Sequence, residues 1–400
     1  MCRSFWLGVR LEFSILHMRR TILIVPGLLS AGEGDSFIRQ SLPALSLLTE
    51  LGTLRKLTTI PDVQTPEALL LGYRPDLVKM NQGPLTVSAL GFDPPKRSTH
   101  FHLSLMSFHD GVASFPPVLP QPDEVDELLY AAKRLDTKRL TILKGEDLDH
   151  AMVWESLGDL GTTPAGKVDG QPMAQYLPEG DGEPAFRRLI DDSINFLSSL
   201  ELNARRLDEG LPPFNLLWPW GQGVRTEVPN LAFTRGEPAM VESSSMRLAG
   251  LTRLAGYKHA DRNAFGRGLG TKLRAIADRA LNRPLTIVYI DAAAELRSRN
   301  KPEELDWFVR ELNRELLQPL LDDVLKNNAR LSLFSPAPLA GLGSPDMPAS
   351  PTGLAAALES GPRGNNPYPF DERSLDERTI PSTDLWSQIE SATTLPEFES

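Results

Sequence analysis

Thirteen residues near the middle of the chain, 211–223, constrain the fold more than any other stretch. They read LPPFNLLWPWGQG and contain two of the six tryptophans. The apolar run 214–217 predicts a short buried strand. We expect Trp218, Pro219 and Trp220 to end this strand, because proline cannot donate a hydrogen bond to a sheet ladder. The glycines that flank Gln222 then permit a tight turn at the carboxyl end of the strand, where open α/β sheets bind ligands.

Two interpretations of this stretch stay open. It is either a core strand followed by a conformational turn, or one wall of a ligand pocket. The second interpretation adds cationic side chains that flank glycine-rich turns elsewhere in the predicted core. The candidate pocket residues are Asn215, Trp218, Trp220, Gly221, Gln222, Gly223, Arg225, Arg267 and Lys272.

Strand and helix patterns alternate along the chain and predict an α/β core with a doubly wound sheet. Residues 21–25 (TILIV) form a continuous apolar run, typical of a central parallel strand that is buried on both faces. Helical spacing follows over 37–51, and further strands are predicted at 284–290 and 329–334. Residues 96–180 have strand–helix–strand content of their own, which predicts a smaller α/β cap domain inserted into the core.

The predicted domain organisation has four parts. The core comprises 18–95 and 181–335, and the inserted cap domain comprises 96–180. Residues 336–400 are rich in Pro, Gly and Ser and then acidic, which predicts a disordered tail. Residues 1–17 carry arginine among apolar residues and lack a signal-peptide core, so we interpret them as an extension before a start at Met18, with an amphipathic anchor as the alternative.

Composition limits the classes of function. The formal net charge is −10, and no basic segment offsets it, which argues against a nucleic-acid partner. No run approaches eighteen apolar residues, so we predict no membrane-spanning helix. The single cysteine, Cys2, excludes an intramolecular disulfide and a cysteine-based metal site, and it is typical of a cytoplasmic protein.

The stretch around Trp218 and Trp220 resembles the N-x-(I/L)-W-L-W-G-Q-G signature of the archaeal-type cofactor-independent phosphoglycerate mutases, members of the alkaline phosphatase superfamily. Shorter motifs in the same order extend the resemblance over about residues 20–335. They are LLGYRP at 70–75, GPL at 83–85, LAGY at 254–257, GTK at 270–272 and VYI at 288–290. The resemblance implies an alkaline-phosphatase-like core sheet with an inserted cap.

The family's chemistry uses two divalent metal ions and a serine nucleophile, and phosphoryl transfer of this kind needs hard ligands and an activated hydroxyl. In this chain the family's positions fall on other residue types. The first metal aspartate falls on Pro26, the nucleophile on Val63, and an aspartate and a histidine of a later motif on Ala294 and Ser298. The last Asp-His pair of the family is replaced by a Ser-Pro sequence at 335–336.

These replacements predict a catalytically degenerate relative with a binding or regulatory role. The chain also resembles bacterial proteins labelled regulatory and linked to pathogenicity-factor gene clusters. We expect no cofactor and an anionic small molecule or a protein as partner. The alternative is an active mutase or phosphatase that holds two manganese or magnesium ions with displaced ligands.

Four other groups of residues are candidates for chemistry. His100 and His102 share one face of a predicted strand and form a weak metal-site candidate, beside the interpretation that they line the cap. The glycines of residues 266–270 precede a helix and are able to present amides to an anion, although a simple turn is the simpler interpretation. Asp291 and Glu295 form a solvated carboxylate pair in the default interpretation. The serines at 243–245 have no histidine near in sequence, so we assign them no catalysis.

Overall fold

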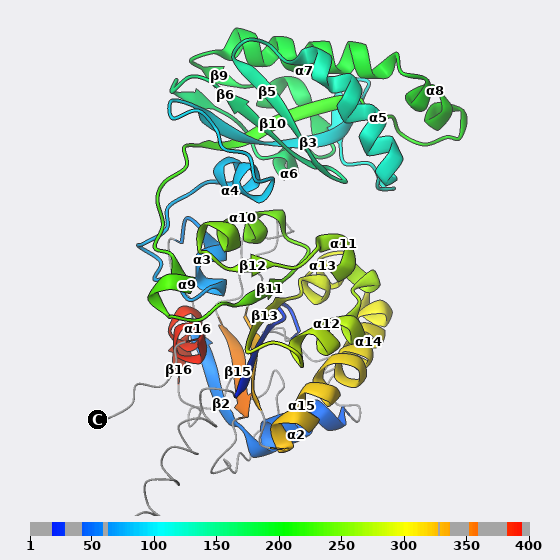
Figure 1. Cartoon of the computed structure of the whole chain (residues 1–400). Coiled ribbons are helices and arrows are strands. Elements are labelled where there is room, and N and C mark those ends of the chain that lie inside the picture. Colours follow the sequence, from blue (N-terminus) through cyan, green and yellow to red (C-terminus); the bar gives the residue numbers. More distant parts are fainter. Residues whose placement is uncertain are drawn as a thin grey trace, which may run out of the picture. The chain divides into compact units, whose positions relative to one another are not determined.

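The computed structural model describes residues 18–28, 42–58, 63–326, 329–336, 352–358 and 382–393. They divide into two compact units, shown in Figure 1. The first, here called the core unit, lies within 1–78, 228–245 and 252–400. The second, the inserted unit, comprises 79–227 and 246–251. The extension predicted at 1–17 lies outside the described residues.

An eight-stranded sheet forms the centre of the core unit, in the order β12-β11-β13-β1-β14-β15-β2-β16. Adjacent strands are parallel except where β15 pairs antiparallel with its two neighbours, β14 and β2. The strands are β1 (Arg19–Ile24), β2 (Thr53–Thr58), β11 (Met240–Glu242), β12 (Lys258–His259), β13 (Leu285–Tyr289), β14 (Ala329–Ser335), β15 (Thr352–Leu358) and β16 (Ser382–Asp384).

Helices cover both faces of this sheet, as Figure 1 shows. Leu23 and Val25 of the first strand and its turn pack into an apolar cluster with α2, α12, α14 and α15. Ile22 and Ile24 point to the opposite face, because successive side chains of a strand alternate. The doubly wound α/β prediction is therefore confirmed. The helices are α2 (Pro43–Leu51), α3 (Pro66–Leu70), α9 (Leu231–Thr234), α11 (Arg262–Phe265), α12 (Leu273–Ala280), α13 (Ala292–Ser298), α14 (Pro302–Glu311), α15 (Gln318–Leu325) and α16 (Leu385–Thr393).

The helical segment from α14 to α15 contains an irregular turn. Residues Leu312–Leu317 form a π-helical segment between α14 and α15. Pro319 lies in the first turn of α15. Because proline lacks an N–H, the preceding carbonyl groups shift their hydrogen bonds, and the helix continues through a wider turn.

The disordered tail predicted for 336–400 is wrong in two places. Residues Thr352–Leu358 form β15, which lies between β14 and β2 in the core sheet. Residues Ser382–Asp384 pair with β2 as β16, and α16 follows directly. Strand pairing on both edges stabilises β15, although its sequence, TGLAAAL, has no strong strand pattern. The rest of the predicted tail, apart from Pro336, lies outside the described residues.

The inserted unit has its own sheet, in which β3 pairs with β6 on one side and with β10 on the other. Phe101, Leu103 and Leu105 of β3 pack into an apolar cluster with α5 and α7. The elements are β3 (Thr99–His109), β4 (Val112–Ser114), β5 (Leu140–Glu146), β6 (Asp149–Trp154), β7 (Leu160–Gly161), β8 (Gln171–Pro172), β9 (Glu179–Gly180), β10 (Leu216–Gly223), α4 (Gln82–Ala89), α5 (Pro122–Ala132), α6 (Ala165–Val168), α7 (Glu183–Ser198), α8 (Glu201–Asp208) and α10 (Met246–Leu254), which ends in the core unit.

This division differs from the predicted inserted domain at 96–180. The inserted unit begins earlier, at Lys79, and runs to Glu227, so it includes α4, α7, α8 and β10. The reason is strand pairing: β10 is antiparallel to β3 over six paired residues and so belongs to the inserted sheet, not to the core. Short elements also occupy the stretch 158–182, which was predicted as loop.

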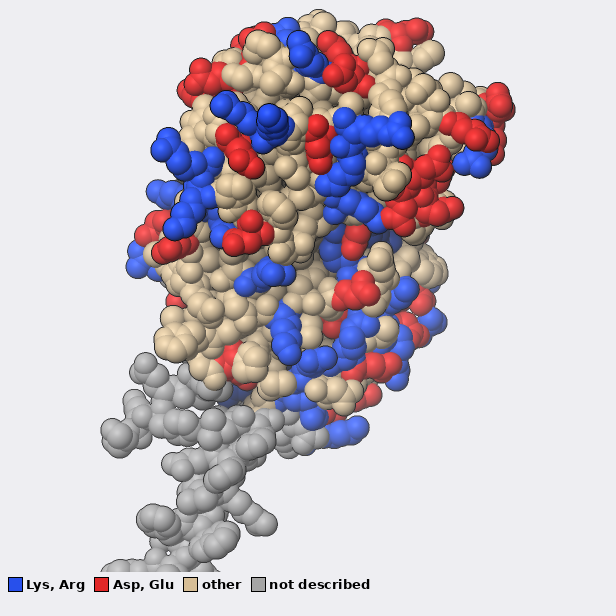
Figure 2. Space-filling view, turned by 45° about the horizontal axis from the view of Figure 1, so that its top comes forward, with Lys and Arg blue, Asp and Glu red and all other residues tan. Residues whose placement is uncertain are grey.

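Charged side chains of both signs are interspersed on the face shown in Figure 2. No large field of one sign appears on that face. In the described part of the chain, every helix is too short or too polar to cross a bilayer.

Candidate functional site

The tryptophan stretch forms β10, an edge strand that continues through Pro219 to Gly223. The prediction that this proline ends the strand is wrong, and the hydrogen-bond pattern gives the reason. The Leu217 N–H points away from β3 and donates to Ser193 Oγ at 3.1 Å. Pro219 lies two residues further and therefore faces the same outer side, where the ladder needs no donor.

The polar groups of this stretch bind other parts of the inserted unit. The Asn215 side chain accepts a hydrogen bond from Phe108 N at 2.7 Å and donates to Phe108 O at 3.1 Å. Trp218 is fully buried, and its Nε1 donates to Thr163 O at 2.8 Å. Trp220 Nε1 donates to Ser104 Oγ at 2.9 Å. Each group has a structural partner, which favours a packing role.

The Gly-Gln-Gly turn packs against the start of α4. A Cβ on Gly221, where φ is +64°, would lie 2.9 Å from Gln82 Cβ. The Gln222 carbonyl accepts from Asn81 Nδ2 at 2.6 Å, and its side chain accepts from the Thr162 hydroxyl. A Cβ on Gly223 would lie 3.3 Å from Pro84 Cγ. The glycines thus allow close helix–strand packing.

His100 and His102 are both buried on the face of β3 that is opposite to the apolar cluster. The Ser98 hydroxyl donates to Pro95 O and contacts His100 Nε2 at 3.0 Å. His102 Nδ1 lies 3.0 Å from Thr86 Oγ1, and its Nε2 lies 3.3 Å from Asp149 Oδ1. Within the described residues, no three His, Cys, Asp or Glu side chains are placed to hold a metal ion.

The cationic candidates do not gather in one unit. Arg225 belongs to the inserted unit and pairs with Asp93 at 3.0 Å, whereas Arg267 and Lys272 belong to the core unit. Lys272 Nζ donates to Asn263 O at 3.2 Å. The amides of residues 270–273 donate to carbonyl groups of the same loop, which leaves fewer for an anion than the glycine pattern suggested.

At the carboxyl edge of the core sheet, the turn after β1 lies directly against α13. Gly27 has φ +71°, and a Cβ there would lie 2.7 Å from Ala294 Cα. Arg297, on the same helix as Ala294, donates from Nε to Gly27 O at 2.5 Å and from Nη2 to Leu28 O at 3.2 Å. Pro26 is buried within this turn. The Arg297 guanidinium group therefore links α13 to the turn after β1, the two segments that carry metal ligands in the family motifs.

The remaining family positions are placed as follows. Val63 is half-buried just before α3, and Ser298 is exposed at the end of α13, where its hydroxyl donates to Glu295 O at 2.7 Å. Ser335 ends β14 and is buried. Val63 lacks the hydroxyl of the family's nucleophile, and Ser298 and Ser335 offer neither the imidazole nor the carboxylate of the family's metal ligands.

Asp291 follows β13 at the same edge. Burial of the carboxyl group and the nearby Glu295 carboxylate raise its pKa to about 6, while Arg267 and a hydrogen bond from Ser244 act in the opposite direction. Ser244 O also accepts from Arg262 Nε at 2.8 Å. The edge thus combines guanidinium and carboxyl groups from several loops.

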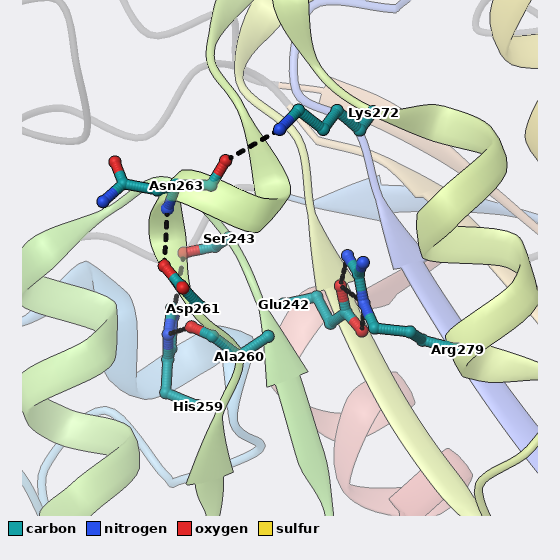
Figure 3. A network of polar contacts seen from close by, with 8 residues as sticks. All are labelled: Glu242, Ser243, His259, Ala260, Asp261, Asn263, Lys272 and Arg279. Atoms are coloured by element: carbon teal, nitrogen blue, oxygen red, sulfur yellow. Dashed lines mark hydrogen bonds and ion pairs between the residues drawn. The ribbon is translucent and has the colours of Figure 1, made fainter.

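Sequence spacing missed one contact at this edge, shown in Figure 3. Ser243 Oγ lies 3.4 Å from His259 Nε2, and His259 Nδ1 lies 2.6 Å from Ala260 O. The sequence shows no histidine near these serines, but the fold brings His259 close to Ser243. The two residues are sixteen apart in sequence but close in space, because β11 and β12 are adjacent parallel strands. Recognising β11 and β12 as paired strands is the signal that would have found this contact.

Acid is expected to destabilise the inserted unit more than the core unit. Burial lowers the pKa of His100 to about 4 and of His150 to about 3 in the inserted unit. Below pH 6.5 the unfolded histidines bind protons that the folded ones do not, so each costs about 1.4 kcal/mol per pH unit down to its folded pKa. In the core unit, His259, with a pKa of about 4, also lowers the stability as the pH falls. The raised pKa of Asp291 has the opposite effect below pH 6, because the folded carboxyl group then binds a proton that the unfolded one does not.

Hydrogen exchange at pH 7 and pH 5 measures this difference. Amides of β3 and β6 should lose more protection than amides of β1 and β13. Equal losses in the two units would contradict the assignment of the buried histidines as neutral.

Sequence comparison finds distant relatives of one description. No family model matches the sequence. A 2,3-bisphosphoglycerate-independent phosphoglycerate mutase from Methanosarcina mazei is 24% identical over 355 residues, covering 83% of this chain and 87% of the relative. A probable enzyme of the same description from Geobacter sulfurreducens is 25% identical over 198 residues, covering 45% and 48%.

Solved structures give the same fold. The PH0037 protein from Pyrococcus horikoshii matches with a TM-score of 0.71 at 15% identity, over 96% of this chain and 99% of that one. A cofactor-independent phosphoglycerate mutase from Thermoplasma acidophilum matches with a TM-score of 0.56 at 17% identity, over 94% and 100%. This chain is thus a distant relative of the archaeal-type cofactor-independent phosphoglycerate mutases, and it has the α/β fold of the alkaline phosphatase class.

Proposed function

We propose that this chain is a phosphoglycerate-mutase-like protein that has lost the mutase reaction. In this proposal it uses the carboxyl edge of the core sheet to bind a small anionic ligand, in a binding or regulatory role. A cytoplasmic location is part of the same proposal and rests on the single cysteine.

The contact between Gly27 and α13 is the observation that carries the proposal. Ala294 packs against the Gly27 backbone, and the Arg297 guanidinium donates to the carbonyl groups of Gly27 and Leu28. A hard dication needs anionic or neutral oxygen and imidazole ligands, and a fixed positive charge at the same place repels it.

The residues at the family's positions also fail to fit two metal ions. Pro26, Val63 and Ala294 carry no side-chain donor, and the Ser298 hydroxyl is used within its own helix. Among the described residues, Asp291 and Glu295 form no group of three His, Cys, Asp or Glu side chains that could hold a metal ion. We therefore derive no catalytic step through a metal.

An anion is the ligand class that the local guanidinium groups favour. Arg262 donates a hydrogen bond to Ser244 O, and the charge of Arg267 acts to lower the pKa of Asp291. Arg297 lies on α13, the helix that follows Asp291. The carboxylates of Asp261, Asp291 and Glu295 lie on the same loops, so the proposal rests on the guanidinium groups as hydrogen-bond donors and not on a net positive charge. Guanidinium groups at the carboxyl edge of an α/β sheet suit an anionic ligand.

The experiment exposes the purified protein to manganese and 3-phosphoglycerate. We expect no tight binding of two manganese ions per chain and no conversion of the substrate. Titration calorimetry in EDTA should still detect binding of 3-phosphoglycerate, weakened at least about tenfold in R267Q, because one charge-assisted contact contributes about 1.5–3 kcal/mol.

The matched control variant is R74Q, which alters an exposed arginine of the core unit. The Methanosarcina mazei relative is the second control. R74Q should bind 3-phosphoglycerate like the unaltered chain, since Arg74 pairs with exposed Asp76. The relative should serve as the positive control for turnover. Two bound manganese ions together with turnover would overturn the proposal, and absence of any binding in EDTA would overturn its anion-binding part.

A further inference from the structure

We infer that Ser243 and His259 form a nucleophile–base pair that makes Ser243 reactive toward small carboxylic esters. This goes beyond the proposed function, because neither residue is among the family positions discussed above. The inference holds whether or not the chain binds an anion at the neighbouring loops.

The first support is the orientation of the imidazole. His259 Nδ1 lies 2.6 Å from the Ala260 carbonyl oxygen, which accepts and cannot donate, so Nδ1 carries the proton. In a neutral ring, Nε2 then holds the lone pair and faces the Ser243 hydroxyl at 3.4 Å. Nucleophile, base and orienting acceptor are the three parts of an activated serine, and the first contact is often long in a structure without substrate.

The second support is the charge state of the base. Burial lowers the pKa of His259 to about 4, and the nearby Arg262 acts in the same direction. The imidazole is therefore neutral near pH 7 and able to accept a proton, and its low pKa makes it a weak base, so the transfer is slow. Arg262 Nε donates to Ser244 O at 2.8 Å, which fixes the backbone next to Ser243.

The third support is the rigid placement of the serine. Ser243 directly follows Glu242, the last residue of β11, and the fully buried Glu242 carboxylate accepts from Arg279 Nε at 2.8 Å and from Nη2 at 2.5 Å. The Asp261 carboxylate accepts from Asn263 N at 2.9 Å and fixes the loop after His259, as Figure 3 shows. Sites held by strand ends are more precise than sites on free loops.

The burial of Ser243 limits what reacts. Its side chain has no exposed surface, and its Oγ also accepts the Ser245 N–H at 3.0 Å. His259 is half-buried, so the imidazole is the part of the pair that has exposed surface. The reaction is consequently slow and restricted to small esters.

The chemical step balances as follows. Ser243 Oγ attacks the ester carbonyl carbon, its proton passes to His259 Nε2, and a C–O bond forms. The tetrahedral intermediate breaks the bond to the leaving alcohol, which takes the proton from Nε2. Water then attacks the acyl-serine, gives one proton through Nε2 back to Oγ, and releases the carboxylic acid.

An alkyl fluorophosphonate probe and p-nitrophenyl acetate test the pair. Mass spectrometry should locate one phosphonyl group on Ser243 of the full chain, with loss in S243A and a rate at least about a hundredfold lower in H259Q. S46A, an exposed serine on α2, should label like the unaltered chain. The rate of p-nitrophenyl acetate hydrolysis should be constant between pH 6 and 8, because the base is already neutral.

Three results overturn the inference. One is absence of a label on Ser243 in the unaltered, folded protein, a result that does not depend on whether any variant folds. Another is equal labelling of H259Q and the unaltered chain, with circular dichroism showing both folded. The third is a hydrolysis rate that rises through pH 6–8, which would contradict a neutral His259 as the base.

Discussion

The I389D variant is expected to unfold the core unit, whereas S391D on the same helix leaves its stability within about 0.5 kcal/mol. Ile389 of α16 is fully buried and Ser391 is exposed. An aspartate at 389 loses the apolar burial and places a carboxyl group in the core, which together cost about 4 kcal/mol or more. This loss is comparable to the whole stability of a typical domain.

Hydrogen exchange localises the effect. Amides of β1 and β13 should exchange freely in I389D and remain protected in S391D. Deletion of residues 382–400 should act like I389D. A deletion protein whose core amides stay protected would show that α16 is dispensable for folding and would support a tail that acts only through partners.

The R20M variant is expected to lower the free energy of unfolding of the core unit by about 3–5 kcal/mol. Arg20 lies in β1 with 7% of its side chain exposed and forms an ion pair with Glu237, whose side chain is 13% exposed. Its Nη1 also donates to Thr393 O at the end of α16, at 3.2 Å. Removing the guanidinium group leaves a buried carboxylate without its partner and releases α16.

Urea unfolding of three further variants tests the cause. The double variant R20M/E237Q should recover part of the loss, since no carboxylate is then left unpaired. R74M, which removes the exposed pair of Arg74 with Asp76, should show no measurable loss. If R20M/E237Q were as unstable as R20M, the loss would come from the α16 contact and not from the buried charge.

The central strands could be predicted from the sequence because each is a continuous apolar run, which indicates a strand that is buried on both faces. The run at 21–25 and the strand at 284–290 became β1 and β13, which pair in parallel over five residues. Strands of this kind are apolar on both faces, and no distant information is needed to recognise them.

The edge strand β10 and the internal strand β15 could not be predicted in the same way. Whether Pro219 ends a strand depends on which side of β10 faces β3, and that is a property of the sheet. Likewise, β15 gains its stability from β14 and β2, two strands whose own sequences are far away. Local patterns do not contain such pairings.

The candidate site was predicted in part. Sequence comparison located the edge at Pro26 and Ala294, and the structure places the two segments in contact. Sequence comparison did not indicate that Arg297 bridges the two segments. The Arg297 guanidinium donates to main-chain carbonyl groups, which every residue has, so no residue type marks the contact. The contact between Ser243 and His259 was missed for the same reason as β10 and β15, namely an unrecognised strand pairing.

The contact between Gly27 and Ala294 has a consequence for how this lineage can change. Under the proposed function, a return of aspartate at 294 alone would meet the Gly27 backbone and the Arg297 charge, so it would gain an ion pair and no metal. Several substitutions would have to arise together before any one was useful. Loss of the metal site is then a one-way step, and later selection acts on ligand recognition and stability, where single substitutions still have separate effects.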